Sequence, residues 1–349
     1  MQNIKLTDPL TQLDDTSLIK YKTAGIIVTK IIDSVTKEIK PNRKLIDIYN
    51  IGIDLVKKEC DKVYQDIKYK GLAFPFCISK NNITGHYIPT NLDVVNDGDI
   101  IKLEIGVHID GYPVSICYST FVPNNNHHEK QQKVMKTVIN ASKEIIKMMT
   151  PEHSNLEISN ILKKYASQNS CNLLMCDIDK NVPGIFSYQM SRHILDGYNE
   201  DSDEYAHGLV LSKDNPNYGF SLRETYFEEN EIYAIDIAVS SGNGKLSILK
   251  EPDIYKRKFE EKADLKLKSS KAVVSLFKDM FPTIVNMKDP KIRLGLKECL
   301  AKNLIEPYYI VAEKENEFIA RVKFTVIIKN EPILLCGKSG DSELAKFIS

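Results

Sequence analysis

Two apolar segments of this sequence each place one acidic residue within a strand-like pattern, where its carboxylate could bind a divalent cation. The first is KLEIGVHIDGYPVSICYST, residues 102–120, in which apolar residues alternate with Glu104 and its neighbours as they do in a β-strand. Asp110-Gly111 predicts a two-residue hairpin turn, because both residues tolerate a positive φ. Pairing across that turn sets Gly106 opposite Ser115, so Glu104 and Ser115 become diagonal neighbours that could share one ion. The hairpin thus offers one carboxylate and one hydroxyl.

The second acidic segment repeats the first. Residues 231–239, EIYAIDIAV, parallel residues 99–107, DIIKLEIGV, and place Asp236 at the position of Glu104. Both segments follow two predicted amphipathic helices and begin a predicted hairpin. Two similar α/β halves that close around a shared cavity would bring Glu104 and Asp236 together. The alternative is a chance likeness between two amphipathic strands.

The elements that would position these residues follow from the apolar periodicity of the chain. Residues 1–18 are predicted to form a polar extension, and Thr16 is a candidate N-cap for the first helix. The predicted helices cover residues 16–40, 41–65, 130–149 and 154–168, and the predicted strands cover 71–79, 98–108, 112–122 and segments between 208 and 245. Residues 255–312 are predicted to be a helical, charged insertion, after which residues 317–330 return to a strand pattern that would complete the second sheet.

The composition excludes several classes of protein. The 349 residues carry 47 Lys or Arg and 47 Asp or Glu, so nucleic-acid or membrane binding would depend on a local charged patch. The seven cysteines form no CxxC pair, which argues against a zinc ribbon or a disulfide framework. The sequence shows no signal peptide and no run of about 18 apolar residues. We therefore expect a soluble, monomeric, cytoplasmic protein with no membrane partner, and additional nuclear or nucleolar residence stays open.

Several long motifs resemble a known family. KGLAFPFCISKNNITGHYIP and the hairpins at residues 102–120 and 231–245 resemble type II methionine aminopeptidases. GVHIDG, YAIDIAVSSGNGK, IYKR, GLKECLAKNLIEPY and FIARVKFTV resemble the proliferation-associated, ErbB-receptor-binding protein family, which comprises catalytically inactive relatives of those enzymes. The resemblance implies an α/β (α+β), two-half pita-bread fold of antiparallel sheets flanked by helices. Its first half would span residues 19–125 and its second half residues 131–349, with the insertion at about 255–312.

The resemblance also implies where the metal ligands of an active relative would fall. Carried over one by one, the five ligand positions are occupied here by Glu104, Ser115, Tyr188, Asp236 and Lys323. His86 keeps the type of a substrate-side histidine, and His193 lies near Tyr188 but off register. An ammonium group at a ligand position repels a cation, so we expect no metal, no other cofactor and no hydrolysis. Lys323 is instead expected to form an ion pair with Glu104 or Asp236.

Three other candidate sites each have a purely structural explanation as well. Cys77 and Cys117 could form a thiol nucleophile near His86, although a free cysteine on a strand is more often a small core residue. The pair His127-His128 lies in a polar segment and is expected to be solvated. SSGNGK, residues 240–245, lacks the spacing of a phosphate-binding loop and predicts a hairpin turn.

Residues 255–271 form the most basic segment of the sequence. Seven bases lie within these seventeen residues, namely Lys256, Arg257, Lys258, Lys262, Lys266, Lys268 and Lys271. Three acidic residues are interspersed, so a solvated helix face is the alternative to a phosphate-binding site. The resemblance implies contact with RNA, including ribosomal RNA of the large subunit, through this region. The Lys-rich C-terminal tail of animal members has no counterpart here, so tail-dependent nucleolar targeting is not expected.

These observations predict a non-catalytic, RNA- and ribosome-associated protein that acts in translation, ribosome biogenesis or growth regulation. Two other functions stay open. One is a residual metal-dependent methionine aminopeptidase, and the other is an adaptor that holds peptides or protein partners in the inactive cleft.

Overall fold

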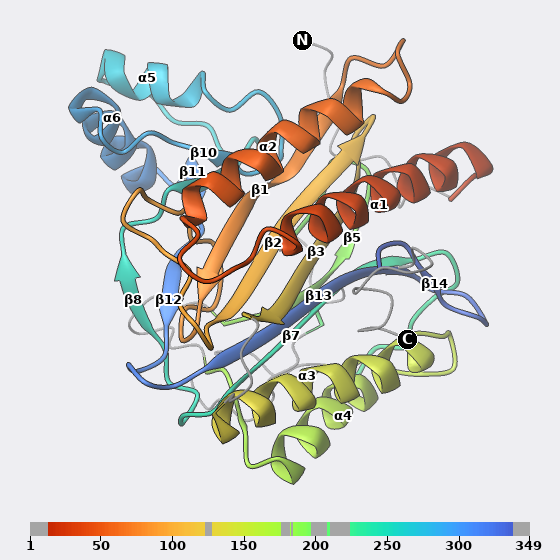
Figure 1. The fold of residues 1–349 in the computed structure, drawn as a ribbon. Helices are drawn as coiled ribbons and strands as arrows, with labels where there is room; N and C mark the ends of the chain where they lie inside the picture. The colour runs from red at the N-terminus through yellow and green to blue at the C-terminus, as the bar shows by residue number, and fades with distance from the viewer. Residues whose placement is uncertain are drawn as a thin grey trace.

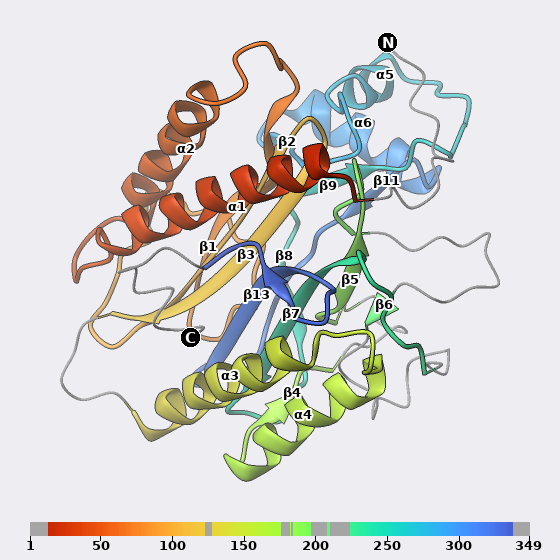
Figure 2. The same ribbon diagram turned by 90° about the vertical axis from the view of Figure 1, so that its right-hand side faces the viewer.

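The computed structural model describes residues 13–122, 128–175, 182, 184–196, 208–209 and 224–337. A single antiparallel sheet of nine strands forms its centre, with two helices over each half of one face (Figure 1). The insertion lies at one end, beside the first half (Figure 2). None of the helices in the described ranges is long and apolar enough to span a membrane.

The first half contains two helices and three strands, α1 (Asp15–Thr36), α2 (Leu45–Asp61), β1 (Lys70–Lys80), β2 (Ile100–Ile109) and β3 (Tyr112–Phe121). Helix α1 is capped by Asp14, whose carboxylate accepts a hydrogen bond from the backbone N–H of Ser17. The prediction of Thr16 as the cap was therefore wrong by two residues. The helix also begins inside the stretch assigned to a polar extension.

The hairpin of β2 and β3 has the predicted register. Gly106 pairs with Ser115 and Glu104 with Cys117. The turn residues Asp110 and Gly111 have φ values of 53° and 82°, the left-handed conformation that such a two-residue turn requires. The position of Glu104 relative to Ser115 is therefore confirmed.

The second half repeats this arrangement with helices α3 (Glu129–Met148) and α4 (Asn155–Gln168) and with strands β4 (Asn172–Leu173), β5 (Ser187–Met190), β6 (Gly208–Leu209), β7 (Ile232–Ser240), β13 (Ile319–Ile327) and β14 (Ile333–Leu334). Both helices begin with a capping box, formed by His128 with Gln131 and by Ser154 with Glu157. His128 is thus a helix cap rather than a freely solvated residue, and His127 lies outside the described residues.

Strand β13 joins the two halves. The path across the sheet runs β1-β2-β3-β13-β7-β5-β6, with β14 paired to β13 and β4 paired to β7. Lys323 of β13 pairs with Cys117 of β3 on one side and with Asp236 of β7 on the other. The strand therefore completes one continuous sheet, where the sequence had predicted a second sheet.

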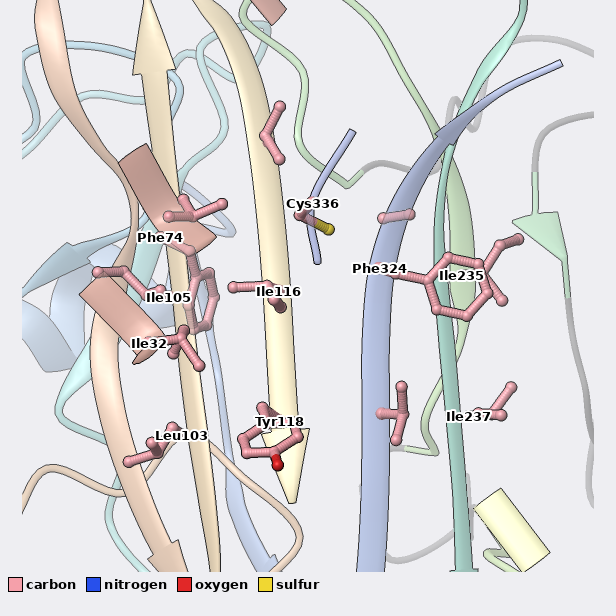
Figure 3. Close-up of a cluster of buried hydrophobic side chains, with 14 of the residues drawn as sticks. Ile32, Phe74, Leu103, Ile105, Ile116, Tyr118, Ile235, Ile237, Phe324 and Cys336 are labelled. Carbon is pink, nitrogen blue, oxygen red and sulfur yellow. The ribbon is translucent and has the colours of Figure 1, made fainter. Parts of the chain in front are cut away.

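The hydrophobic core lies between the sheet and the helices. Figure 3 shows Ile105 and Ile116 of the first half and Ile235 and Phe324 of the second, all fully buried side chains of the helix-covered face. Because side chains alternate along a strand, their neighbours Glu104, Ser115, Asp236 and Lys323 lie on the opposite face. The alternation of side chains along each strand therefore places these four residues on the face of the sheet away from the helices.

The insertion is only partly helical. Strand β8 (Ser247–Lys250) leads into it, and it comprises β9 (Ile254–Arg257), α5 (Lys268–Val274), β10 (Thr283–Ile284), α6 (Pro290–Ala301), β11 (Ile305–Pro307) and β12 (Ile310–Ala312). Strands β10, β9 and β11 form a three-stranded sheet, which corrects the prediction of a wholly helical segment. A separate small core that includes Tyr255, Leu296 and Cys299 holds this sheet against α5 and α6.

Candidate functional site

Four charged side chains meet on the face of the sheet away from the helices. Glu104 comes from β2, Asp236 from β7, and Arg321 and Lys323 from β13. Arg321 precedes Lys323 by two residues and therefore points to the same side of the strand. The two predicted halves thus bring Glu104 and Asp236 to one place, and Arg321, which the sequence analysis had not singled out, lies between them.

The guanidinium of Arg321 binds both carboxylates in a bidentate manner. Its Nη1 and Nη2 donate to Oε2 and Oε1 of Glu104 at 2.9 and 2.8 Å. Its Nε and Nη2 donate to Oδ1 and Oδ2 of Asp236 at 2.8 and 2.6 Å. Planar guanidinium groups match carboxylates in this way better than ammonium groups do. One side chain therefore links a strand of the first half to a strand of the second.

Lys323 adds the second positive charge. Its Nζ donates to Oε1 of Glu104 at 2.7 Å and lies 3.0 Å from Oδ2 of Asp236. The expected ion pair of Lys323 is confirmed, with both acids rather than one. We call Glu104, Asp236, Arg321 and Lys323 the ion quartet, in which two negative and two positive charges balance.

Burial makes this balance necessary. The side chains of Arg321, Glu104 and Asp236 are only 1, 2 and 3% exposed, and that of Lys323 is 13% exposed. Burial alone would raise the pKa of Glu104, but the charges of Arg321 and Lys323 outweigh it and hold the pKa well below its usual range. Burial would likewise lower the pKa of Lys323, and the two carboxylates raise it instead. Both groups are therefore charged at neutral pH, and so is the guanidinium of Arg321.

The loop after β1 covers the ion quartet. A Cβ atom added at Gly85 would overlap Nη1 of Arg321 and lie 3.1 Å from Oε2 of Glu104. The next residue, His86, has its Nε2 3.9 Å from the same Oε2 atom and its Nδ1 3.1 Å from the carbonyl oxygen of Tyr309. Burial lowers the pKa of His86, although Glu104 opposes this. Gly85 therefore leaves the space that the guanidinium occupies.

The other two predicted ligand positions contribute little charge. The Ser115 hydroxyl is buried and has no hydrogen-bond partner among the described residues, while its backbone N–H donates to the Thr325 hydroxyl. Tyr188 pairs with Ala234, two residues before Asp236 on β7, and burial raises its pKa well above the usual range. His193 lies apart from these residues, at the tip of the β2–β3 hairpin. Its backbone N–H donates to the carbonyl oxygen of Gly111.

These residues do not fit a divalent metal site. The space between Glu104 and Asp236 holds a guanidinium and an ammonium group, both of which repel a cation. No cluster of three His, Cys, Asp or Glu side chains suited to a metal occurs within the described ranges. No hydrolytic step through a metal follows from this geometry.

A thiol nucleophile does not fit the site either. Cys77 and Cys117 are both buried. Burial raises the pKa of Cys77 well above its usual value and the pKa of Cys117 to about 12. The thiolate that nucleophilic catalysis requires is therefore scarce at neutral pH, and both cysteines serve as small core residues.

A further buried base lies beside the ion quartet. Lys102, 1% exposed, donates its Nζ to the carbonyl oxygens of Asn81 and Ile319 at 2.8 and 3.0 Å. Burial lowers its pKa to about 7, because neither partner carries a negative charge. The sequence showed Lys102 only as one of the alternating residues of the hairpin strand, and its burial comes from β13 folding over it.

Lys256 belongs to a second internal network. Its Nζ lies 2.9 Å from Oδ1 of Asp196, and the Tyr308 hydroxyl donates to both oxygens of the same carboxylate at 2.9 and 2.7 Å. The Lys256 side chain is 17% exposed. Lys256 was predicted to contact RNA, but its ammonium group is occupied by Asp196. In this position it links the insertion to residues 191–196.

The remaining bases of the predicted segment differ in exposure. Arg257 and Lys258 are half-buried, and the Lys258 Nζ donates to the side-chain oxygen of Asn303 at 3.0 Å. The four bases that follow are exposed, namely Lys262, Lys266, Lys268 and Lys271. They do not lie on one helix face as supposed, because the chain is irregular from residue 258 until α5 begins at Lys268.

Helix α6 extends this basic surface, which the sequence analysis missed. Lys291, Arg293, Lys297 and Lys302 are exposed on or at the end of the helix. Glu298, its only acidic residue, turns inward to accept hydrogen bonds from the backbone of Lys266 and Leu267 and from the Ser270 hydroxyl. Residues 258–303 carry eleven Lys or Arg against six Asp or Glu, in a chain that is neutral overall. Counting charge over this longer window would have found the signal.

Comparisons with known proteins agree with this architecture. The sequence profile of Metallopeptidase family M24 matches residues 19–258. ERBB-3 binding protein 1 of Arabidopsis thaliana is 33% identical over 320 residues, which are 88% of this chain and 77% of that relative. A solved structure of a thermophilic Arx1 superposes with a TM-score of 0.79 at 22% identity, covering 96% of this chain and 94% of the other.

A methionine aminopeptidase from Rickettsia prowazekii has the same fold. Its crystal structure superposes with a TM-score of 0.60 at 14% identity and covers 94% of this chain and 99% of that enzyme. At these identities the two superpositions show a shared fold and no more. They confirm the predicted pita-bread arrangement of two halves with antiparallel strands and flanking helices.

Proposed function

Because the chain belongs to Metallopeptidase family M24, and within it to the proliferation-associated, ERBB-3-binding-protein branch, we propose that it is a non-catalytic RNA- and ribosome-associated protein. The observation that carries the non-catalytic part is Arg321, which together with Lys323 lies where a peptidase of this fold would hold its metals. The expected role is in translation, ribosome biogenesis or growth regulation.

The rival function is a residual metal-dependent methionine aminopeptidase. Its test is release of methionine from a Met-Ala-Ser peptide by the purified full chain with added cobalt or manganese. We expect no release above a no-protein blank and no heat of binding when either metal is titrated in. Stoichiometric metal binding together with peptide cleavage would refute the non-catalytic assignment.

The basic surface of the insertion supports the RNA part. We define the insertion surface as the exposed bases Lys262, Lys266, Lys268, Lys271, Lys291, Arg293, Lys297 and Lys302. Helices α5 and α6 are held together by Glu298, so these bases lie on neighbouring elements of one small unit. An excess of cations on one exposed unit attracts phosphate groups without regard to sequence. Ribosomal RNA is the target that the family resemblance implies.

The RNA part is tested by the salt dependence of binding. If about four bases contact phosphates of an RNA duplex, affinity should drop about a hundredfold between 50 and 200 mM salt, by analogy with the slope of roughly −0.9 per contact for DNA. The variant Lys268→Glu, Lys271→Glu, Lys291→Glu should weaken binding to unrelated RNAs alike and flatten the slope. The matched control is Lys136→Glu with Lys147→Glu, two exposed bases on α3, which should leave binding unchanged.

One result would contradict the assigned RNA site, and another would contradict the ribosomal target. The first is an unchanged slope in the α5–α6 variant, which would place the RNA site elsewhere. The second is a lysate gradient in which the protein never migrates with ribosomal particles at low salt, which would remove the ribosomal target while leaving RNA binding intact.

A further inference from the structure

The insertion contains a cavity that neither the ion quartet nor RNA binding explains. It has a volume of about 260 Å³ and lies between the segment after β8, helix α6 and the β11–β12 segment. We propose that it is a docking pocket for a peptide segment of another protein that carries one large apolar side chain and a nearby carboxylate. This goes beyond the proposed function, because it gives the insertion a protein partner.

The walls of the cavity suit an aliphatic side chain. Leu296 and Pro252 are buried, Met287 and Pro307 are half-buried, and Leu300 at the rim is 37% exposed. Sites for small-molecule ligands usually measure about 300–1,000 Å³, so this cavity is small for a whole cofactor. It is large enough for one Leu, Met or Phe side chain. The size and the lining therefore indicate an anchor residue of a peptide.

The rim of the cavity selects a negative charge. Arg293 and Lys297 lie four residues apart on α6, are both exposed and line the same cavity. Neither forms an ion pair with a described residue, and two like charges at this spacing cost a few tenths of a kcal/mol unless an anion joins them. A carboxylate of the peptide would remove that repulsion and accept hydrogen bonds from both side chains.

A lining residue outside α6 gives the peptide a direction. Glu251, on the segment that follows β8, lines the cavity without an ion pair to a described residue. It would accept hydrogen bonds from backbone N–H groups or a basic residue of the peptide. A peptide with its carboxylate toward α6 and a hydrogen-bond donor toward Glu251 would pair with the charged groups of both segments.

A peptide fits this cavity better than an RNA base does. A base binds by stacking on an open aromatic face, worth about 1–3 kcal/mol. Here the Tyr255 ring is 2% exposed, and Tyr309, the other aromatic residue of the lining, is half-buried, so neither presents a fully open face.

The experiment is a selection of random heptapeptides, displayed on phage, against the full chain, followed by fluorescence anisotropy with the synthetic selected peptide. We expect selected sequences to place Leu, Ile, Met or Phe within three residues of Asp or Glu. The variant Arg293→Glu, Lys297→Glu should weaken binding of that peptide at least tenfold. The matched control, Lys291→Glu with Lys302→Glu, changes two exposed bases of the same helix outside the cavity and should stay within twofold of the wild type.

A second measurement locates the bound peptide. In protein labelled with ¹³C at the methionine methyl groups, the Met287 signal, assigned with Met287→Leu, should shift on peptide addition. The proposal is overturned if no sequence class is selected, if the Arg293 and Lys297 variant binds like the wild type, or if Met287 does not shift. It is also overturned if an RNA oligonucleotide shifts Met287 and displaces the peptide, because the cavity would then belong to the RNA surface.

Discussion

The ion quartet and the insertion both depend on lysine and arginine, but the two regions use them in opposite ways. In the ion quartet, Arg321 and Lys323 lie 2.6–3.0 Å from carboxylates, and their side chains are 1 and 13% exposed. On the insertion, Lys268, Lys271 and Arg293 are exposed, and no ion pair joins them to another described residue. The first pair of cations holds the fold together, whereas the second group is available to a partner.

The difference teaches that the position of a cation in the fold determines its use. Lys256 and Lys268 belong to one basic segment of the sequence, yet Lys256 is fixed on Asp196 inside the molecule and Lys268 faces solvent. Substitutions in the two regions should therefore act on different properties. Those in the ion quartet should change the stability of the fold, and those on the insertion should change binding to a partner. The predictions below test that separation.

Arg321→Met should produce the largest loss of stability. It leaves Glu104 and Asp236 buried with only Lys323 between them, and breaking a buried ion pair in this way costs about 3–5 kcal/mol. Denaturant unfolding monitored by circular dichroism measures the change. The matched control is Arg293→Met on the exposed face of α6, which should stay within about 0.5 kcal/mol of the wild type. Equal stability of the two variants would refute the distinction between the regions.

Gly85→Ala should come next, at up to about 3 kcal/mol, because the new methyl group would force the Arg321 guanidinium away from the carboxylates. The diagnostic measurement is a double-mutant cycle with Arg321→Met. If the methyl group acts through the guanidinium, Gly85→Ala should cost much less in the Arg321→Met background. An additive cycle would mean that the loop itself is strained.

Lys102 should make stability depend on pH by a smaller amount. Its pKa is lowered from 10.5 to about 7 in the folded chain, so between these values the unfolded chain holds a proton that the folded chain has lost. Stability should therefore rise with pH in that range. Relative to Lys102→Met, the wild type should gain about 2 kcal/mol from pH 7 to pH 9, at 1.36 kcal/mol per unit of pKa shift. Parallel pH profiles of the two proteins would show that Lys102 stays charged.

The smallest expected effects lie within the basic segment itself. Lys256→Ala should cost about 1–2 kcal/mol, because it removes the charged partner of Asp196. Lys268→Ala should change stability by less than about 0.5 kcal/mol and should instead weaken RNA binding. The reverse pattern, with Lys268 stabilising and Lys256 binding RNA, would contradict the assignment of the two residues.

The fold and the approach of the two acids were predictable from local pattern. The alternation around Glu104 and the turn at Asp110-Gly111 specified the β2–β3 hairpin, and the repeat placed Asp236 on a matching strand. A register of strands is fixed once a turn and a buried face agree, so these predictions needed no tertiary information. The hairpin predicted at residues 231–245 is not formed, because β7 pairs with β13, β5 and β4 and the following β8 pairs with β12. The pairing of β13 with the first half could not be read from the sequence, because it depends on contacts more than 200 residues apart.

The site was predicted only in part. Lys323 was found because it stands at a ligand position, and Arg321 was missed although it shares the same strand face two residues earlier. An arginine in a strand usually projects to solvent, and only the meeting of β2, β7 and β13 buries this one. The strands of the insertion were missed because β9, β10 and β11 have only two to four residues, too few to show a period.

The central place of β13 has a consequence for synthesis of the protein. Glu104 and Arg321 are 217 residues apart, and Arg321 is made later. At about 5–20 residues per second, the nascent chain waits roughly 10–40 s between the two. From the time β7 has been made until β13 follows, β3 and β7 each have an open edge, and the carboxylates of Glu104 and Asp236 lack their counter-ions. Folding of the two halves into one sheet is therefore a late event of translation, and the growing chain is most exposed to aggregation just before β13 emerges.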